Sequence, residues 1–478
     1  MTRNLSTILV ALAVAACAAA PADAAKRFTI RGAGFGHGVG MSQYGAMGYA
    51  SHGWDYKRIL GHYYTDTDLG VLKEPRTVRV LLQSVSGTAS FSGASRAGGR
   101  KLSPGATYLV RGRAGGQVQL LTRRGREIAT LPAPLRATGP GPLTLKGSSG
   151  YARRDGAYRG ALEFRPGTFG GVNTINAVDV DDYVQGVVPL ESPASWPIEA
   201  LKAQAVAART YALTTTKSGA GFEHYPDTRS QVYGGVGAEQ PSTNAATQQT
   251  AGQVVTYQGA PVATYFFSTS GGRTEDVEKS GLGTRPLPWL KSVEDQYDDV
   301  SPRHRWGPIK LTMGAAAAKL RGLVRGRFRG IDVITRGRSP RIVAADIVGS
   351  AGRVRVNGPT LRARFGLYDS WAYFTSIRTG KAPTPLPDET PDPAVPMIAR
   401  VPDVAGLSGR VMPACEAKPV TSEARQCAVV RVQRRFHGRW VPAGETTTDR
   451  RGRYHAGVSA HGLYRVVYKG DAGPGIRL

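Results

Sequence analysis

Cysteine and long apolar runs are the scarcest features of this 478-residue sequence. It contains three cysteines, and the CxxC, HExxH and Walker phosphate-loop motifs are absent, so redox, zinc-protease and nucleotide chemistry are not indicated. The apolar run from Leu5 to Ala20 has 16 residues, fewer than the ~20 that span a bilayer. Glycine (61) and proline (31) are abundant, which favours strands and turns and excludes a coiled coil. We expect no cofactor.

The N-terminus is typical of a secretory signal peptide over residues 1–24. Arg3 precedes the apolar run, and Ala22-Asp23-Ala24 supplies a small-residue cleavage site. The expected location is therefore outside the cell or in the cell wall. The alternative is a lipid anchor through Cys17, because residues 14–17 resemble a bacterial lipobox.

Acidic residues are also few. The 35 Asp and Glu residues stand against 62 Lys and Arg, which leaves a net charge of +27. The span 303–365 holds 15 Lys or Arg and two acidic residues, Asp332 and Asp346. For an exported protein this charge favours an anionic wall polymer over nucleic acid as a partner. The alternative is a solvated basic surface without a dedicated partner.

A proline-rich stretch divides the chain into two folded parts. Residues 381–396 contain six prolines and are expected to form an extended linker. The part after it, residues 397–478, alternates apolar and polar side chains at 429–433 and 463–468. This pattern predicts a small all-β sandwich that serves as an accessory domain.

The remaining cysteines lie in this C-terminal part. Cys415 and Cys427 are spaced to close a 13-residue loop. In an oxidising compartment such a pair is expected to form a disulfide, which by chain entropy stabilises the fold by roughly 3 kcal/mol.

The large part, residues 27–380, is predicted to be α+β and mainly β, with a few helices. Short apolar runs broken by glycine and proline predict strands at 77–82, 117–121 and 254–257. A β-rich segment is expected at about 75–165.

One segment of this part has a helical pattern. Residues 198–213 are good helix formers with apolar side chains on one face, which predicts a helix with Ser195 as its N-cap. A strand at 176–180 and a turn at Asp181-Asp182 are expected before it. Glu191 therefore lies on the connection that leads into the helix.

Two glycine-rich stretches display polar side chains. Residues 34–46 read GFGHGVGMSQYGA and carry His37, Ser42 and Gln43, and residues 265–275 carry Ser270. A phosphate loop is not indicated, because no Gly-Lys-Ser/Thr follows. The glycines are instead expected to let the backbone approach a ligand or another segment closely.

Five separated segments together resemble the SpoIID/LytB family of bacterial cell-wall proteins; they are residues 34–46, 187–213, 227–235, 266–275 and 289–298. The resemblance implies a lytic transglycosylase that cleaves peptidoglycan glycan strands. Alternatively, it implies a non-catalytic peptidoglycan-binding protein that stimulates an amidase, as described for the LytB branch. It also implies that the family's catalytic glutamate corresponds to Glu191, and that Arg209 has a functional role.

The sequence departs from the family pattern twice. The GHGVGMSQ motif, expected at the C-terminal end of the domain, stands here at 36–43, which predicts a circular permutation. The motif should then pack against the region of Glu191 and line the same groove as Ser270, and residues 371–374 should lie beside the strand that begins near Phe28. A zinc site seen in some family members is not expected, because His224 has no cysteine within 190 residues.

The chemistry can be argued from Glu191 itself. Glycosidic bond cleavage needs a carboxylic acid with a raised pKa to protonate the leaving oxygen. A single acid/base suffices if the C6 hydroxyl of muramic acid then attacks C1 to give a 1,6-anhydro ring. The alternative is that Glu191 only binds N–H groups at the helix N-terminus, which would lower its pKa.

Neutral polar side chains in the same motifs suit sugars that carry little charge. The candidates for substrate binding, together with Arg209 from the resemblance, are Gln231, Tyr233, Ser270, His37, Ser42 and Gln43. For His37, the alternative is a hydrogen bond within its own glycine-rich loop.

Overall fold

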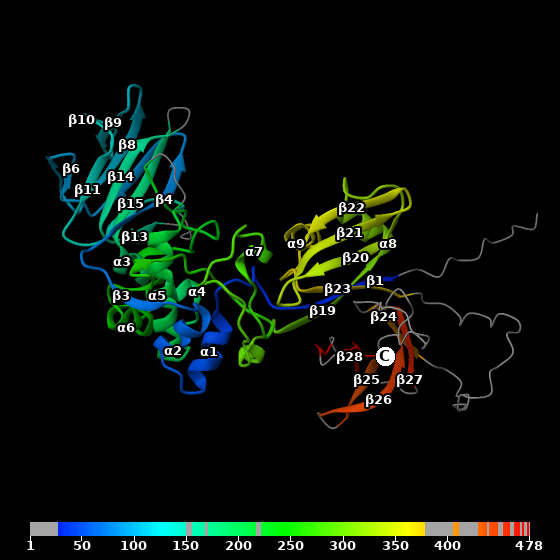
Figure 1. Cartoon of the computed structure of the whole chain (residues 1–478). Helices are drawn as coiled ribbons and strands as arrows, with labels where there is room; N and C mark the ends of the chain where they lie inside the picture. Colours follow the sequence, from blue (N-terminus) through cyan, green and yellow to red (C-terminus); the bar gives the residue numbers. More distant parts are fainter. Residues whose placement is uncertain are drawn as a thin grey trace, which may run out of the picture.

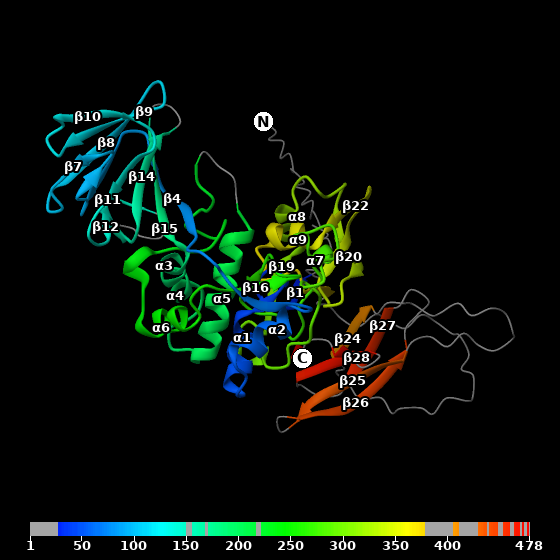
Figure 2. The same cartoon turned by 60° about the vertical axis from the view of Figure 1, so that its left-hand side comes forward.

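A computed structural model describes residues 27–149, 155–167, 171–216 and 221–377, together with seven strand segments between 405 and 477. The predicted signal peptide, Cys17, the proline-rich stretch predicted to be a linker, Cys415 and Cys427 lie outside the described residues. Within residues 27–377, a β-rich region, a central helical region and a smaller β region follow one another across the molecule (Figure 1). Figure 2 shows the same three regions after a 60° turn.

The β-rich region consists of two six-stranded sheets (Figure 1). One has the order β10-β9-β8-β5-β12-β13, with bounds Glu127–Pro132, Gln117–Thr122, Thr107–Arg113, Thr88–Ser92, Leu143–Leu145 and Gly156–Tyr158. The other has the order β4-β15-β14-β11-β6-β7, with bounds Thr77–Val85, Val172–Asp179, Ala161–Pro166, Leu135–Thr138, Arg96–Ala97 and Arg100–Lys101. Alternate apolar side chains from both sheets form one core, in which the rings of Phe91 and Phe164 lie 4.9 Å apart.

The central region is built around helix α5, Ile198–Thr214. Leu201 and Ala205 on one side of α5 belong to the core of the β-rich region, and Ala203 and Val206 on another side belong to a second core. Small alanine side chains let the helix pack closely on both sides, because little volume separates its backbone from its neighbours.

Short elements surround α5 in this central region. The helices are α1 (Gln43–Ser51), α2 (Tyr56–Tyr63), α3 (Val180–Gln185), α4 (Val188–Glu191), α6 (Pro241–Gln249), α7 (Val277–Ser280), η2 (Gly235–Ala238) and η3 (Asp298–Val300). The strands are β2 (Met41–Ser42), β3 (Asp68–Val71), β16 (Gln253–Tyr257), β17 (Ala260–Pro261) and β18 (Phe266–Phe267).

The smaller β region has two three-stranded sheets. Their orders are β19-β1-β23 (Arg305–Thr312, Arg27–Ala33, Ala372–Ile377) and β20-β21-β22 (Phe328–Arg336, Ile342–Gly349, Gly352–Asn357). Helices α8 (Met313–Lys319) and α9 (Gly358–Phe365) pack on them around a core that contains Phe28, Phe328 and Phe365. Residues 371–374 lie beside the strand that contains Phe28, as the permutation predicts.

The described segments beyond residue 404 are all strands. They are β24 (Ala405–Arg410) with β27 (Arg453–Val458), and β25 (Val429–Phe436), β26 (Arg439–Thr447), β28 (Leu463–Tyr468), β29 (Asp471–Ala472) and β30 (Ile476–Arg477). Two antiparallel sheets result. The predicted fold class, mixed α+β and mainly β with an all-β C-terminal part, is confirmed.

Two local predictions near the central helix are wrong. The expected turn at Asp181-Asp182 is part of helix α3, because Asp179 caps the helix by accepting a hydrogen bond from the Asp181 N–H. Ser195 is not the N-cap of α5, since Pro197 occupies that position without a side-chain hydrogen bond. The helix starts at Ile198 as predicted.

Candidate active site

Glu191 is the last residue of the short helix α4, which connects α3 to α5. Its side chain is half-buried and held from two sides. The Oε1 atom accepts a hydrogen bond from the backbone N–H of Val232 over 3.1 Å. The Oε2 atom accepts one from the side-chain amide of Gln43 over 3.4 Å. Three segments that are distant in the sequence therefore meet at this carboxyl group.

Burial raises the pKa of Glu191 above its ordinary value, because the charged form loses hydration. The hydrogen bonds from Val232 and Gln43 act in the opposite direction but do not cancel this effect. The interpretation in which Glu191 binds the N–H groups of α5 is wrong, since its partners lie on other segments. Burial thus favours the protonated carboxyl group, which is the form that a general acid needs.

The glycine-rich segment 34–46 reaches this site by pairing with residues 265–271. Phe35 and Thr269 exchange backbone hydrogen bonds, and β2 runs parallel to β18. Gly38 adopts a φ of +87°, and a Cβ atom there would collide with the guanidinium group of Arg341. The prediction that this segment packs against the region of Glu191 is confirmed through Gln43.

Ser42 and Ser270 do not line an open groove, since both side chains are 0% exposed. The Ser42 hydroxyl donates to Asp298 Oδ1 over 2.9 Å and caps α1 by accepting from the Gly45 N–H. It also accepts from the Ser270 N–H, and the Ser270 hydroxyl accepts from the Gly272 N–H. The shared-groove expectation is wrong for these two residues, because their hydroxyl groups hold the loops together.

A buried carboxylate pair beneath these loops was not anticipated from the sequence. Asp298 accepts hydrogen bonds from the N–H groups of Ser270 and Gly271. Asp295 is 1% exposed, and burial together with the charge of Asp298 raises its pKa to about 7. Gly45 has no side chain where a Cβ atom would meet both Asp295 and the Tyr63 hydroxyl. Both aspartates lie in the family-like segment 289–298, but its sequence does not indicate that they are buried.

His37 supports its own loop. Its Nδ1 atom accepts a hydrogen bond from the Val39 N–H over 3.1 Å, and its Nε2 atom lies 3.1 Å from the carbonyl oxygen of Phe266. Burial, together with the positive charges of Arg362 and Arg341, lowers the pKa of His37 to about 3. The imidazole is therefore neutral at physiological pH, and the predicted hydrogen bond within the glycine-rich loop is confirmed.

Arg209 lies inside the protein rather than at the Glu191 carboxyl group. Its guanidinium group is 0% exposed, forms an ion pair with Asp181, and donates to the carbonyl oxygens of Gln253 and Thr247. These contacts join α5 to α3, α6 and β16. The ion pair and the two carbonyl acceptors explain how a buried arginine is accommodated in this helix.

Gln231 and Tyr233 flank the residue that binds Glu191, but their own side chains are 1% exposed. Gln231 donates to the Ala208 carbonyl oxygen and accepts from the Tyr183 hydroxyl. The Tyr233 hydroxyl donates to Asn176 Oδ1 over 2.8 Å. Both side chains fix the position of the Val232 N–H, and their role in substrate binding stays a prediction.

Sequence reasoning missed several residues around the carboxyl group. Gln204 on α5 accepts a hydrogen bond from Gln43, and Tyr211 lies seven residues later on the same helical face. Burial, then Tyr265 and then Glu191 raise the pKa of Tyr211 to about 12. The i, i+7 spacing of Gln204 and Tyr211 is the signal that could have found them.

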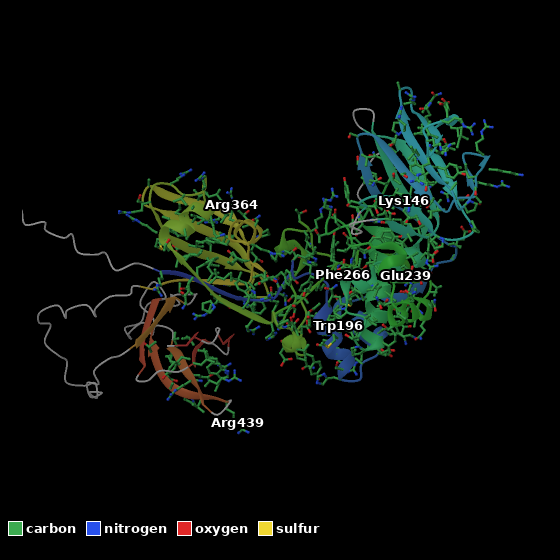
Figure 3. All side chains as sticks on the ribbon, turned by 180° about the vertical axis from the view of Figure 1, so that it is seen from behind. Lys146, Trp196, Glu239, Phe266, Arg364 and Arg439 are labelled. Atoms are coloured by element: carbon green, nitrogen blue, oxygen red, sulfur yellow. The ribbon has the colours of Figure 1, made fainter. Side chains whose placement is uncertain are left out.

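Aromatic side chains lie near the same segments. The rings of Tyr44 and Trp196 meet edge to face at 5.0 Å, and Tyr211 approaches Phe266 at 6.0 Å. Figure 3 marks Trp196 and Phe266 in the central part of the molecule, between the two β regions. These rings are half-buried and leave part of their surface to solvent.

The described residues offer neither a cluster of metal ligands nor a helix long and apolar enough to cross a membrane. In that part of the chain, His, Cys, Asp and Glu form no group of three that could hold a metal ion. His224 is fully buried, and its Nε2 atom lies 2.8 Å from the carbonyl oxygen of Ala212. Among the helices described, none has the length and apolar character needed to cross a bilayer.

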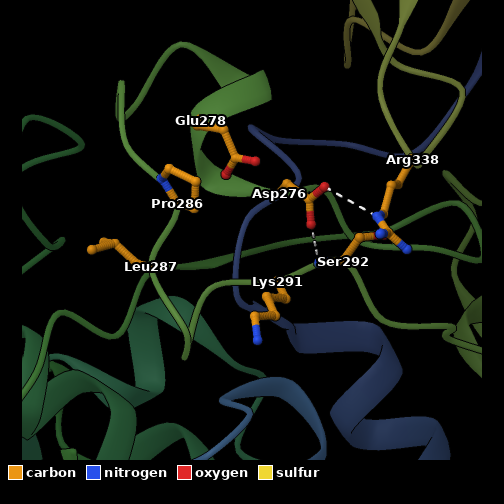
Figure 4. Close-up of a pocket in the computed structure, with 7 residues that line it drawn as sticks. All are labelled: Asp276, Glu278, Pro286, Leu287, Lys291, Ser292 and Arg338. Carbon is orange, nitrogen blue, oxygen red and sulfur yellow. Dashed lines mark hydrogen bonds and ion pairs between the residues drawn. The ribbon is translucent and has the colours of Figure 1, made fainter.

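A separate pocket of about 240 Å³ lies near α7 (Figure 4); it is lined by Asp276, Glu278, Pro286, Leu287, Lys291, Ser292 and Arg338. Within it, Asp276 accepts a hydrogen bond from the Ser292 N–H and forms an ion pair with Arg338 at 3.4 Å. Glu191 and Gln43 are not among its lining residues. The pocket therefore does not coincide with the candidate active site.

Comparison with known proteins supports the sequence resemblance. Residues 168–257 match the SpoIID family, described as Stage II sporulation protein. Over 210 residues the chain is 31% identical to Stage II sporulation protein D of Bacillus subtilis, which covers 40% of this chain and 57% of that protein. It is 41% identical over 116 residues to the amidase enhancer of Bacillus subtilis, covering 24% of this chain and 15% of that protein.

A third relative is an uncharacterised protein of Brachyspira hyodysenteriae, 36% identical over 139 residues, covering 28% of this chain and 38% of that protein. The chain thus spans between 15% and 57% of the length of these three relatives. The family match contains Glu191, Arg209 and Val232, whereas the glycine-rich segment 34–46 lies outside it. On this match, together with the relatives named for sporulation and amidase enhancement, residues 168–257 are identified as a SpoIID-family domain.

Proposed function

We propose that this protein is a secreted lytic transglycosylase that cleaves the glycan strands of peptidoglycan, with Glu191 as its acid/base. The observation that carries the proposal is the half-buried Glu191 carboxyl group, whose raised pKa suits a proton donor. Its hydrogen-bond partners within the described residues are the Val232 N–H and the Gln43 amide, rather than a second carboxylate. A single acid/base is what a reaction without a water nucleophile requires.

The proposed reaction proceeds as follows. Protonated Glu191 donates its proton to the glycosidic oxygen O4, and the bond between C1 of muramic acid and O4 breaks. The Glu191 carboxylate then accepts the proton of the C6 hydroxyl while the C6 oxygen bonds to C1. The products are a 1,6-anhydro-muramic acid end and a free 4-hydroxyl end, and Glu191 is protonated again.

Other residues of the site support this chemistry. Val232 and Gln43 fix the two carboxyl oxygens of Glu191, and the half-buried rings of Tyr44, Trp196 and Tyr211 offer apolar faces to sugar rings. Ser42 and Ser270 act indirectly, by holding the loop that carries Gln43.

Purified peptidoglycan incubated with the protein tests the proposal. Mass analysis of the released fragments should show 1,6-anhydro ends, and the substitution Glu191→Gln should abolish them while the free energy of unfolding changes by less than about 1 kcal/mol. Normal production of anhydro ends by the Glu191→Gln variant would refute the assignment.

A second candidate function is favoured by the similarity to the amidase enhancer. In this case the protein would bind peptidoglycan without cleaving it and would increase the activity of a partner amidase. The protein alone would release no fragments, but it would accelerate the release of wall peptides by an added amidase. An unchanged amidase rate would exclude this function.

The net charge of +27 supports an anionic wall polymer as a further partner. The basic span 303–365 is not one free surface, however. Arg341 is buried against Asp369, and Arg353 and Arg355 form ion pairs with Asp346. Fewer unpaired Lys and Arg side chains are therefore available on the surface of this span than the 15 in its sequence.

A further inference from the structure

Gln43 lies between the side chains of Glu191 on α4 and Gln204 on α5. Its Nε2 atom lies 3.4 Å from Glu191 Oε2 and 3.4 Å from Gln204 Oε1. A primary amide has two N–H groups, so one can point to each acceptor. Gln204 thereby fixes which end of the Gln43 amide faces the carboxyl group: the nitrogen rather than the oxygen.

We propose that Gln43 is the positioning residue for Glu191, holding its carboxyl group in place through this amide donor and setting the pH at which it releases its proton. The inference rests on the proposed function of Glu191 as acid/base and goes beyond it. It assigns the glycine-rich segment 34–46 a role in setting the pKa and orientation of the Glu191 carboxyl group, in addition to the predicted binding of sugar.

The anchoring of α1 supports this role. Gln43 is the first residue of α1 and is 7% exposed. The preceding Ser42 caps the helix and donates to the fully buried Asp298, which also binds the Ser270 N–H. These hydrogen bonds fix the backbone from which the Gln43 side chain extends, and the amide itself is held by its two bonds to Glu191 and Gln204.

No charged side chain described in the structure pairs with Glu191, so the Gln43 amide is the side-chain donor that influences its pKa. Within the described residues, the Val232 N–H binds the other oxygen, and no Lys, Arg or His side chain pairs with Glu191. The titratable neighbours are Tyr183 on α3 and Tyr211 on α5, whose pKa values are both raised by burial and by Glu191. Both are neutral phenols at physiological pH, so they do not hold Glu191 ionised.

The direction in which Gln43 shifts the pKa of Glu191 follows from its role as a hydrogen-bond donor. An N–H that points at a carboxyl oxygen stabilises the ionised form and lowers the pKa. Loss of the Gln43 donor should therefore raise the pKa of Glu191 further. A hydrogen bond to a charged group corresponds to a shift of roughly 1 to 2 pH units. The acid would then stay protonated at higher pH, but its orientation would be less fixed.

The test compares three substitutions in the full chain. Gln43→Met keeps the length of the side chain and removes both N–H groups. Gln204→Met removes only the acceptor that orients Gln43. Gln248→Met makes the same chemical change at an exposed position of α6 and serves as the control. Thermal unfolding of each variant establishes that the protein is folded.

Two readouts are measured for each variant. The first is the titration of the Glu191 carboxyl carbon by NMR in protein with ¹³C-labelled glutamate, where the signal is assigned by its absence in Glu191→Gln. The second is the pH profile of kcat/KM for peptidoglycan cleavage. We expect Gln43→Met to move the titration midpoint and the alkaline limb upward by roughly 1 to 2 pH units, with a lower kcat. Gln204→Met should give a smaller shift in the same direction, and Gln248→Met none.

The two readouts distinguish failure of the positioning role of Gln43 from failure of the proposed transglycosylase function. A Glu191 titration midpoint that stays the same in Gln43→Met would overturn the positioning role, whether or not activity falls. If the midpoint moves but the wild-type protein produces no anhydro ends, the positioning role stands and the proposed transglycosylase function fails.

Discussion

Arg27 and Ile377 are paired residues of the antiparallel strands β1 and β23. Arg27 is the first residue of β1, and Ile377 is the last residue of β23, so a hairpin turn could join them directly. The start of the strand that precedes the glycine-rich segment, at Arg27, therefore lies next to the end of the last described strand before the predicted linker, at Ile377. This is the arrangement that a circular permutation of the domain would leave.

The first prediction is that the permutation can be reversed. A protein in which a short Gly-containing turn links Ile377 to Arg27, with new termini at the exposed stretch 73–75 between β3 and β4, should fold, because no described strand or helix is cut. Cooperative unfolding and the ¹³C signal of Glu191 would check the fold. An aggregated or molten product, when the unpermuted fragment 27–377 folds, would contradict the prediction.

Arg209 should be needed for stability rather than chemistry. Arg209→Met leaves Asp181 without its ion-pair partner and removes two buried hydrogen bonds, so unfolding in urea should show a loss of about 3 to 5 kcal/mol. Arg229→Met, which breaks an exposed ion pair with Asp227, should cost less than about 1 kcal/mol. A fully stable Arg209→Met variant that has lost peptidoglycan cleavage would instead assign Arg209 to the reaction.

Asp295 should make stability depend on pH. Its pKa is about 7 in the folded protein against 3.8 ordinarily, so the fold prefers the neutral form. The stabilising contribution is fully present below pH of about 4 and is lost as the pH rises to about 7. Asp295→Asn stays neutral, and it should exceed the wild type in stability at pH 8 by up to about 4 kcal/mol, with little difference at pH 4.

Denaturant unfolding at both pH values would measure this effect. Asp299→Asn makes the same chemical change at an exposed position and is the matched control. If Asp295→Asn and Asp299→Asn responded to pH in the same way, burial would not be what raises the pKa of Asp295.

Ser42 should act through the loop and not through sugar contact. Ser42→Ala removes the α1 N-cap and the hydrogen bond to Asp298, which should reduce stability by about 2 to 3 kcal/mol. Thr312→Ala, which removes an exposed N-cap of α8, should cost about 1 kcal/mol. Equilibrium binding of glycan fragments at low temperature provides the distinguishing measurement: a loss of affinity above tenfold in a folded Ser42→Ala protein would indicate direct substrate contact.

The local sequence by itself determined the main elements. The apolar and alanine-rich pattern at 198–213 yields helix α5, since side chains three and four residues apart share a face. The alternating pattern at 463–468 yields strand β28 with the predicted bounds. Glu191 was identified as the candidate acid because its motif and its place before the helix are both local properties of the chain.

Only the tertiary structure decided what surrounds that acid. Gln43 meets Glu191 through a contact between residues 148 positions apart, and no local pattern encodes such a distance. Likewise, Ser42 and Ser270 resemble exposed turn residues in the sequence but are fully enclosed. Burial also raises the pKa of Glu191 and Asp295, because desolvation depends on the packed environment of a side chain rather than on its neighbours in the chain.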